Sequence, residues 1–166
     1  MTDATLAAAL LTLRSALGVV FVAHGAKHFR NRAKTIAWTA SIGFRRPAIQ
    51  WFFMTFAEIG IGAALLVGVV TPVAASGLVA MMVVAFWTVH RHAGFFVTAR
   101  PDEGWEYVAT LLAASLALAL LGPGEWSIDD AIGLAENLDG YVGLGLVLAG
   151  AAAGAGQVAT FFRPQN

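Results

Sequence analysis

Long apolar runs separated by short polar segments are the dominant pattern along this chain. A helix needs ~20 mainly apolar residues to cross a bilayer. Five runs approach that length: residues 5–27, 49–70, 72–90, 105–121 and 140–162. The pattern therefore predicts an all-α, polytopic membrane helix bundle, with residues 1–166 forming a single membrane domain.

Proline and short polar side chains mark the predicted connections between these runs. Thr71 precedes Pro72, which predicts Thr71 as the N-cap of the third span and a tight hairpin between the second and third spans. Residues 30–44 mix basic and apolar side chains and suit either a short basic helix in the headgroup layer or an ordered loop. Ser127 followed by Asp130 resembles a capping box and predicts a short helix after the fourth span.

The composition narrows the chemistry available to the chain. Hydrophobic residues make up 58% of the 166 residues, charged residues make up only 12%, and there is no cysteine. The sequence thus excludes disulfides, thiolate metal ligation and thiol catalysis, so redox chemistry would need a borrowed cofactor. The first run resembles a secretory signal in part, but Arg14 interrupts it and no Lys or Arg precedes it, so we expect a retained helix.

Charge is distributed unevenly between the two predicted sides of the membrane. One side carries acidic residues and no Lys or Arg, whereas nine basic residues fall on the other: Lys27, Arg30, Arg32, Lys34, Arg45, Arg46, Arg91, Arg100 and Arg163. The positive-inside rule predicts a bacterial cytoplasmic membrane protein with its N-terminus outside and its C-terminus inside. Orientation and contact with anionic lipid explain the basic residues, so nucleic acid is not an expected partner.

Two charged residues lie within the apolar runs, Arg14 in the first and Glu58 in the second. An isolated charge in hydrocarbon is costly, so each residue needs a partner or a function. At 1.5 Å per helical residue their expected depths overlap within side-chain reach. We therefore predict that both face the bundle interior and form an ion pair, which serves either as a structural tie between the first two helices or in function.

The predicted topology places every histidine at the inner end of the bundle: His24, His28, His90 and His92. Glu106 and Tyr107 join them, and Lys27 either belongs to the same pocket or reaches the headgroups. The cluster predicts a polar pocket under an apolar roof, suited to a ring with polar edges or to proton exchange. A metal bound by the four histidines is a weaker alternative, because no carboxylate is adjacent in sequence to either pair, and we expect none.

The last span is rich in small residues. Gly143, Gly150 and Gly154 recur at helical spacing. They predict close packing against another helix of the same chain or, alternatively, a face for a homo-oligomer.

Several short motifs follow one another in a specific order: Arg-Ser-Ala-Leu-Gly from Arg14, Phe-Val-Ala-His-Gly-Ala-Lys from Phe21, Ala57-Glu58 with Gly60 and Gly62, Val89-His90, Gly94-Phe95-Phe96, Trp105-Glu106-Tyr107, and Leu-Gly-Pro-Gly-Glu-Trp-Ser-Ile-Asp from Leu121. In this order and spacing they resemble the DoxX family of small integral membrane proteins, over about residues 10–132. The resemblance implies a four-helix core, to which the fifth, C-terminal helix is an addition. His28 and His92 depart from the family pattern, which more often has an apolar residue and proline there.

The resemblance also implies a functional class. DoxX-like proteins are named for a subunit of a thiosulfate:quinone oxidoreductase, and relatives are linked to oxidative defence. The residues that match the pattern give ligand-binding or proton-relay candidates: Arg14, His24, Lys27, Glu58, His90, Glu106 and Tyr107.

The leading hypothesis is a membrane subunit of an electron-transfer or oxidative-defence system that holds a quinone-like ring near the cytoplasmic leaflet. His24 and His90 would hydrogen-bond the ring oxygens, Glu58 or Glu106 would exchange protons, and another protein would supply electrons. The alternative is a non-catalytic accessory subunit of a larger membrane complex. The sequence leaves open whether the chain is an enzyme.

Overall fold

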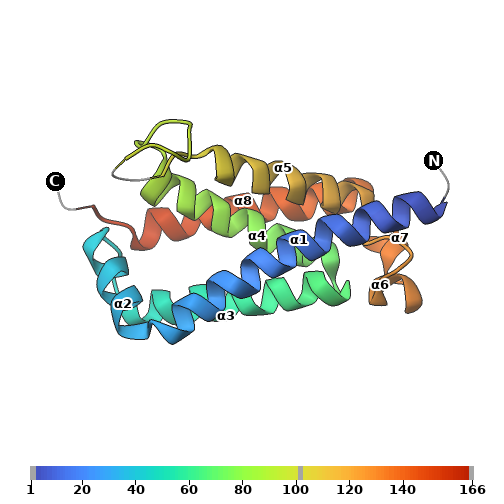
Figure 1. The fold of residues 1–166 in the computed structure, drawn as a ribbon, viewed down its shortest axis with the longest axis horizontal. Coiled ribbons are helices and arrows are strands. Elements are labelled where there is room, and N and C mark those ends of the chain that lie inside the picture. The colour runs from blue at the N-terminus through green and yellow to red at the C-terminus, as the bar shows by residue number, and fades with distance from the viewer. Residues whose placement is uncertain (1–2, 101–102, 165–166) are drawn as a thin grey trace.

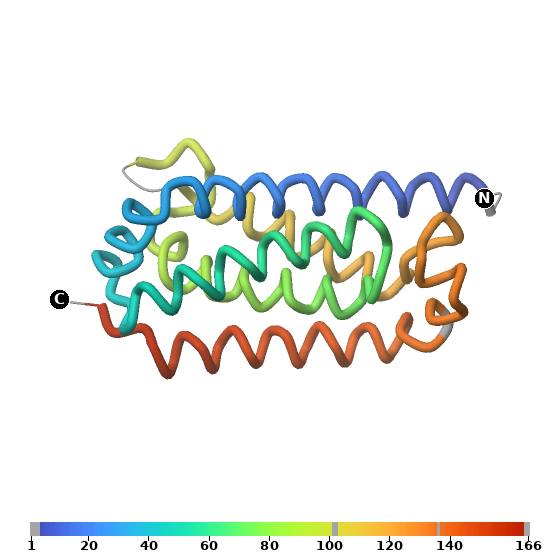
Figure 2. The backbone as a smooth tube through the Cα atoms, turned by 90° about the horizontal axis from the view of Figure 1, so that it is seen from below, coloured from blue at the N-terminus to red at the C-terminus, as the bar shows by residue number. Residues whose placement is uncertain are grey.

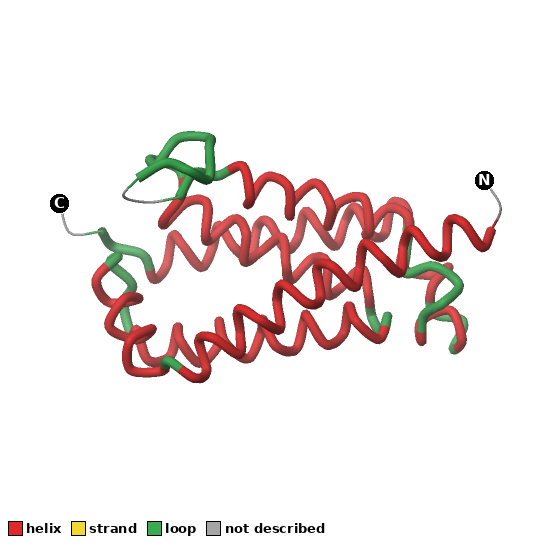
Figure 3. The backbone as a smooth tube through the Cα atoms, in the orientation of Figure 1, coloured by secondary structure: helices red, strands yellow, loops and turns green. Residues whose placement is uncertain are grey.

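The computed structural model describes residues 3–100 and 103–164. It confirms the all-α prediction over these residues (Figures 1 and 3). In chain order the helical elements are α1 (Asp3–Arg30), α2 (Arg32–Ser41), α3 (Pro47–Val67), α4 (Thr71–Ala85), the π-helical turn η1 (Phe86–His90), α5 (Glu106–Leu121), α6 (Ile128–Ala131), α7 (Ala135–Leu138) and α8 (Gly140–Phe161).

Four of the five predicted spans are long and apolar enough to cross a membrane, namely α1, α3, α4 continued by η1, and α8. The fifth, α5, has 16 residues. At 1.5 Å per residue it is about 24 Å long, shorter than the ~30 Å hydrocarbon core. It packs along α4 and α8. Its crossing of the membrane therefore stays a prediction.

Consecutive long helices run in opposite directions, so their ends gather at the two ends of the bundle (Figures 1 and 2). The α6 end holds the start of α1, the turn between α3 and α4, and the short helices α6 and α7. The α2 end holds α2, the connection from η1 to α5, and the end of α8. The sequence predicted nine basic residues on the inner side of the membrane. The segments that carry them all lie at the α2 end. Of the two alternatives predicted for residues 30–44, the structure shows the short helix, α2.

The packed core and the loosely packed region occupy different halves of the bundle. Leu10, Leu17, Leu65, Leu78 and Leu118 are buried in one cluster toward the α6 end. Helices α3 and α4 are joined by a tight turn there and separate toward the α2 end (Figure 1). This separation leaves room for the cavity described below.

Helix α8 approaches its neighbours so closely that only glycine fits at three positions. A methyl group on Gly143, Gly150 or Gly154 would overlap a carbonyl oxygen of Ala119, Ser76 or Ala80, respectively. The predicted close packing within the chain is therefore confirmed. The alternative of a homo-oligomer through these three glycines is wrong, because they are buried against α4 and α5.

The connection after α5 is tied to the hairpin between α3 and α4. Ser127 caps α6 as predicted, since its Oγ accepts the Asp130 N–H at 3.1 Å. Asp129 accepts the N–H groups of Val70 and Thr71 at 2.6 and 2.8 Å. The prediction of Thr71 as the cap was wrong, because α4 begins at Thr71 itself and the Thr71 hydroxyl has no hydrogen-bond partner among the described residues.

Candidate functional site

Arg14 is buried, with 2% of its surface exposed, but its partners are backbone groups at the α6 end. Its guanidinium donates to the carbonyls of Leu65 at 3.0 Å and Leu66 at 2.8 Å, and to the carbonyl of Trp126. The first two belong to the last turn of α3, where carbonyls lack helical partners. Arg14 thus caps α3 and ties it to α1 and to the segment before α6.

The predicted ion pair between Arg14 and Glu58 is wrong. Leu65 lies seven residues beyond Glu58 on α3, which is about 10 Å along a helix and too far for one side chain to serve both positions. The error comes from depths estimated from uncertain span ends. Both residues do face the interior as predicted, since Glu58 is 8% exposed.

A cavity of about 520 Å³ lies between α1, α3 and α4 in the half of the bundle nearer α2. Its walls are mainly apolar. Its polar lining comprises His24, His28, Thr39, Gln50, Glu58, Thr88, His90, Tyr107 and Gln157. The volume is within the range of ~300–1,000 Å³ typical of small-molecule sites, which also combine apolar walls with a few polar groups.

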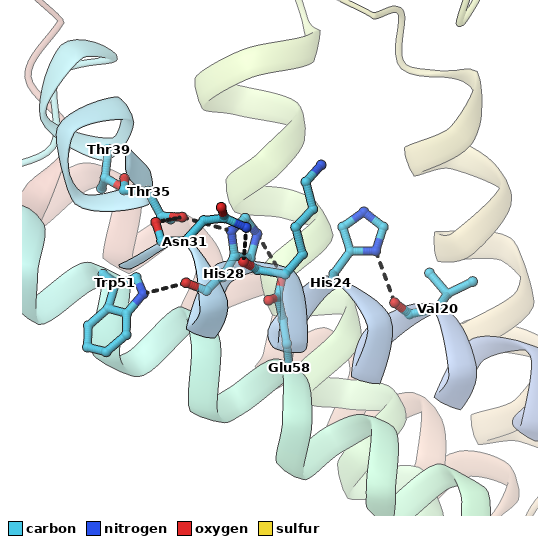
Figure 4. Close-up of polar contacts among 9 residues, drawn as sticks. Val20, His24, His28, Asn31, Thr35, Thr39, Trp51 and Glu58 are labelled. Carbon is cyan, nitrogen blue, oxygen red and sulfur yellow. Dashed lines mark hydrogen bonds and ion pairs between the residues drawn. The ribbon is translucent and has the colours of Figure 1, made fainter. Parts of the chain in front are cut away.

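Glu58 and His28 face each other across α3 and α1 (Figure 4). The Nε2 atom of His28 lies 3.7 Å from Oε1 of Glu58, while Oε2 of Glu58 has no hydrogen-bond partner among the described residues. The Trp51 indole donates to the His28 carbonyl at 3.0 Å, and Nδ1 of the His28 ring lies 3.5 Å from the Thr35 hydroxyl oxygen. The pair therefore places a carboxyl group with one unpartnered oxygen beside an imidazole whose other nitrogen lies near Thr35.

Backbone carbonyls position the rings of the other two histidines of the cavity. The Nδ1 atom of His24 lies 3.0 Å from the Val20 carbonyl oxygen, and that of His90 lies 2.6 Å from the Glu103 carbonyl oxygen. Because a carbonyl only accepts, we assign each Nδ1 as the donor, which leaves each Nε2 free to exchange a proton. The Tyr107 ring stacks on His24, with 6.5 Å between ring centroids.

Three predicted site residues do not line this cavity. Glu106 lies in a separate, open groove of about 590 Å³, which meets the cavity at Tyr107. Its Oε1 accepts the Val97 N–H at 2.9 Å. Lys27 is exposed at the end of α1, and Arg14 lies near the α6 end. The structure therefore brings together His24, Glu58, His90 and Tyr107 from the predicted set, and adds His28.

The four histidines do not form one metal site. His92 is exposed and does not line the cavity that His24, His28 and His90 share. Within residues 3–100 and 103–164, no group of three His, Asp or Glu side chains is arranged to hold a metal ion.

Two features of the cavity were missed in the sequence. Gln157 donates from Nε2 to Oε1 of Gln50 at 2.8 Å, which links α8 to α3. Gln50 and Gln157 are polar residues within apolar runs, as Arg14 and Glu58 are. Their polarity could therefore have marked them in the sequence as residues that face the bundle interior. The other feature is η1, the π-helical turn that ends in His90. Such widened turns are frequent at functional sites, but nothing in the residue pattern marks this one.

A model of the DoxX family matches residues 9–91, which is half of the chain. The chain belongs to the DoxX family. No match was found among curated proteins or among solved structures. The DoxX match runs from α1 through η1, so most of the cavity wall lies within it. Among the polar lining residues, only Tyr107 and Gln157 come from outside the match.

Proposed function

We propose that this DoxX protein is a subunit of an electron-transfer or oxidative-defence system in the bacterial cytoplasmic membrane, and that its cavity holds a quinone-like ring. The observation that carries the proposal is that Glu58, whose Oε2 is buried without a hydrogen-bond partner among the described residues, lines a mainly apolar cavity together with three imidazoles. A buried polar atom without a partner costs free energy, and a ligand that supplies the missing hydrogen bond removes that cost. A flat ring with polar edges satisfies the polar atoms and the apolar walls together.

The roles of the side chains follow from their hydrogen bonds. A neutral Nε2 of His24 or His90 accepts a proton from a ring hydroxyl, and a protonated Nε2 donates to a ring carbonyl. Both states suit a ring that alternates between carbonyl and hydroxyl forms. Glu58, beside His28, is the acid–base group that passes the proton onward.

A bound quinone would supply the electron-accepting chemistry, and the chain would supply binding and proton exchange. The sequence contains no cysteine for a redox disulfide or thiolate cluster. Electrons therefore come from a partner protein. We place that partner on the cytoplasmic side, because the cavity lies in the half of the bundle that carries the basic residues.

A thermal-shift experiment in mild detergent tests ring binding. The probe is a fully substituted benzoquinone, which has no free ring position for covalent addition. At about 100 times its dissociation constant, binding adds ~2.7 kcal/mol and raises Tm by roughly 5–10 °C for a chain of this size. We expect this shift in the natural protein and in Glu106→Gln, whose carboxylate lies in the groove, and expect it to be lost in Glu58→Gln. Absence of a shift in the natural protein contradicts the proposal.

A second candidate is an accessory subunit without chemistry of its own. It is favoured by exposed aromatic rings on α1 and α3, where Phe52 and Phe56 lie 4.7 Å apart between centroids and Phe29 packs edge-on against Phe56. Such a patch suits contact with another membrane helix. Under this alternative, Glu58→Gln leaves the activity of the assembled complex unchanged, whereas under the first proposal it abolishes activity in a folded protein.

A further inference from the structure

The two sides of the cavity differ in polarity. On the side between α1 and α5, the exposed lining residues are His24 and Tyr107. On the side between α3 and α8, they are Phe53, which is 64% exposed, and Ala57. At 3.6 residues per turn, Phe53 and Ala57 lie on the edge of α3 away from α1, whereas Glu58 lies on the edge toward α1. The cavity thus has a polar side and an apolar, lipid-facing side.

On the apolar side of the cavity, a side-chain hydrogen bond joins α3 to α8. Helix α3 packs along α1 and α4, and α8 packs along α4 and α5. The helices α3 and α8 meet at the α2 end, where Arg45 donates its N–H to the Phe161 carbonyl at 2.8 Å, and they diverge from there (Figure 2). Just inside that end, the amide of Gln157 bonds to the 6%-exposed Gln50. We call the opening between α3 and α8 beyond this bond the lateral mouth.

The far end of the lateral mouth is closed by contact between α3 and α4. A methyl group on Gly77 would lie 2.8 Å from Cδ1 of Ile61, so the two helices touch there. From Gln50 to Ile61 the mouth extends over 11 residues, or about 16 Å along α3. Its rear wall includes Ala80 and Met81 of α4. A slot of this length with apolar walls suits an aliphatic chain, whereas a ring alone needs only the region near Glu58.

We propose that the ligand is a ring with an apolar tail, that it enters from the lipid through the lateral mouth, and that its tail stays in the mouth while its ring reaches Glu58. The Gln50–Gln157 bond is the clasp that closes the inner end of the mouth. This inference rests on the proposed function, because it takes the cavity to hold a ring. It adds the entry route, the tail and the role of α8, which lies outside the family match.

Carbodiimide labelling of Glu58 in proteoliposomes at pH 6 tests the mouth without a bound ligand. Lipophilic dicyclohexylcarbodiimide reaches carboxyl groups from the membrane, and peptide mass spectrometry reports the Glu58 adduct. We expect labelling to slow severalfold in Ala57→Trp, because the indole fills the mouth. We expect it to rise about fivefold in Gln157→Ala, the change given by loss of one net hydrogen bond. Ala63→Trp, on an exposed part of α3 outside the cavity lining, is the matched control and leaves labelling unchanged.

Protection of Glu58 by quinones then separates the two proposals. A decyl-tailed benzoquinone protects the natural protein at lower concentration than the same ring without a tail, and Ala57→Trp removes that advantage. Labelling that is unchanged in both Ala57→Trp and Gln157→Ala, or equal protection by the two quinones, overturns the lateral mouth as the ligand's route. If labelling changes as expected in Ala57→Trp and Gln157→Ala but neither quinone protects Glu58, the lateral mouth is supported as a route to Glu58. The proposal that the cavity holds a quinone-like ring is then overturned.

Discussion

At the scale of single residues, the two charges within the apolar runs have different roles. Arg14 directs its donors at three backbone carbonyls, so its charge is used to fix the ends of helices and loops. Glu58 has one oxygen near His28 and one without a hydrogen-bond partner among the described residues. The two terminal nitrogens of Arg14 are both used in bonds between elements, although its Nε has no partner among the described residues, so Arg14 serves structure. Glu58 lines the cavity and is available for chemistry.

This difference predicts opposite outcomes for two substitutions. Arg14→Ala leaves the carbonyls of Leu65, Leu66 and Trp126 without their donor and lowers the free energy of unfolding by about 3 kcal/mol. Glu58→Gln has nearly the same shape and leaves stability almost unchanged. Denaturation in mild detergent, followed by near-UV circular dichroism, measures both variants. Equal losses in the two variants would restore the idea that these residues stabilise each other.

The sequence predicted which charges face inward but not what they contact. Inward orientation follows from the cost of charge in hydrocarbon, which is large for Arg14 and Glu58 and smaller for neutral Gln50 and Gln157. The partners depend on depth to within one helical turn, and on carbonyls such as that of Trp126 that are brought near only by folding. The types of the residues alone give neither the depth of a side chain to within one turn nor the carbonyls that folding brings near it.

At the scale of elements, α8 is held by close backbone approach, and its glycines are of two kinds. Gly150 leaves no room for a methyl group beside the Ser76 carbonyl, whereas a methyl group on Gly145 would have no atom within 4 Å.

Apolar run length predicted α8 and the other long helices, because a bilayer requires about 20 apolar residues. The π-helical turn η1 could not be predicted, since its widened hydrogen bonding depends on packing around the cavity.

Gly150 and Gly145 of α8 give a matched pair of substitutions. Gly150→Ala pushes α8 away from α4 and destabilises the protein by about 1–3 kcal/mol, as overpacking of a tight interface does. Gly145→Ala meets no neighbour and is neutral or stabilising by up to ~1 kcal/mol, because alanine favours the helix. Melting temperatures in the same detergent compare the two. If Gly145→Ala is the more damaging change, α8 does not pack on α4 through Gly150.

At the scale of the whole molecule, charge and packing are both asymmetric along the bundle axis. The basic residues lie at the α2 end and the close-packed core lies toward the α6 end. The cavity occupies the half nearer the basic residues. If the basic end faces the cytoplasm, the proton-exchanging groups and the partner that delivers electrons meet on the same side of the membrane.

Thiol labelling tests this orientation, and the absence of natural cysteine makes it specific. Asn137→Cys places a thiol in α7 at the predicted outer end, and Ser41→Cys places one in α2 at the predicted inner end. Both positions are exposed. In intact spheroplasts an impermeant maleimide should label the first variant at once and the second only after the membrane is opened. The reverse order would invert the topology and place the cavity toward the outside.

The bonds that Asp129 and Arg14 make at the α6 end have a mechanical consequence for the hairpin of α3 and α4. They anchor the end of α3 and the start of α4 to the same segment of chain, so that region acts as a pivot. From there to Gln50 the lever arm is roughly 25 Å at 1.5 Å per residue, and a tilt of about 5° displaces its tip by ~2 Å. Such a swing parts the two glutamine amides together with the Arg45–Phe161 backbone bond at the same end, while the pivot stays intact.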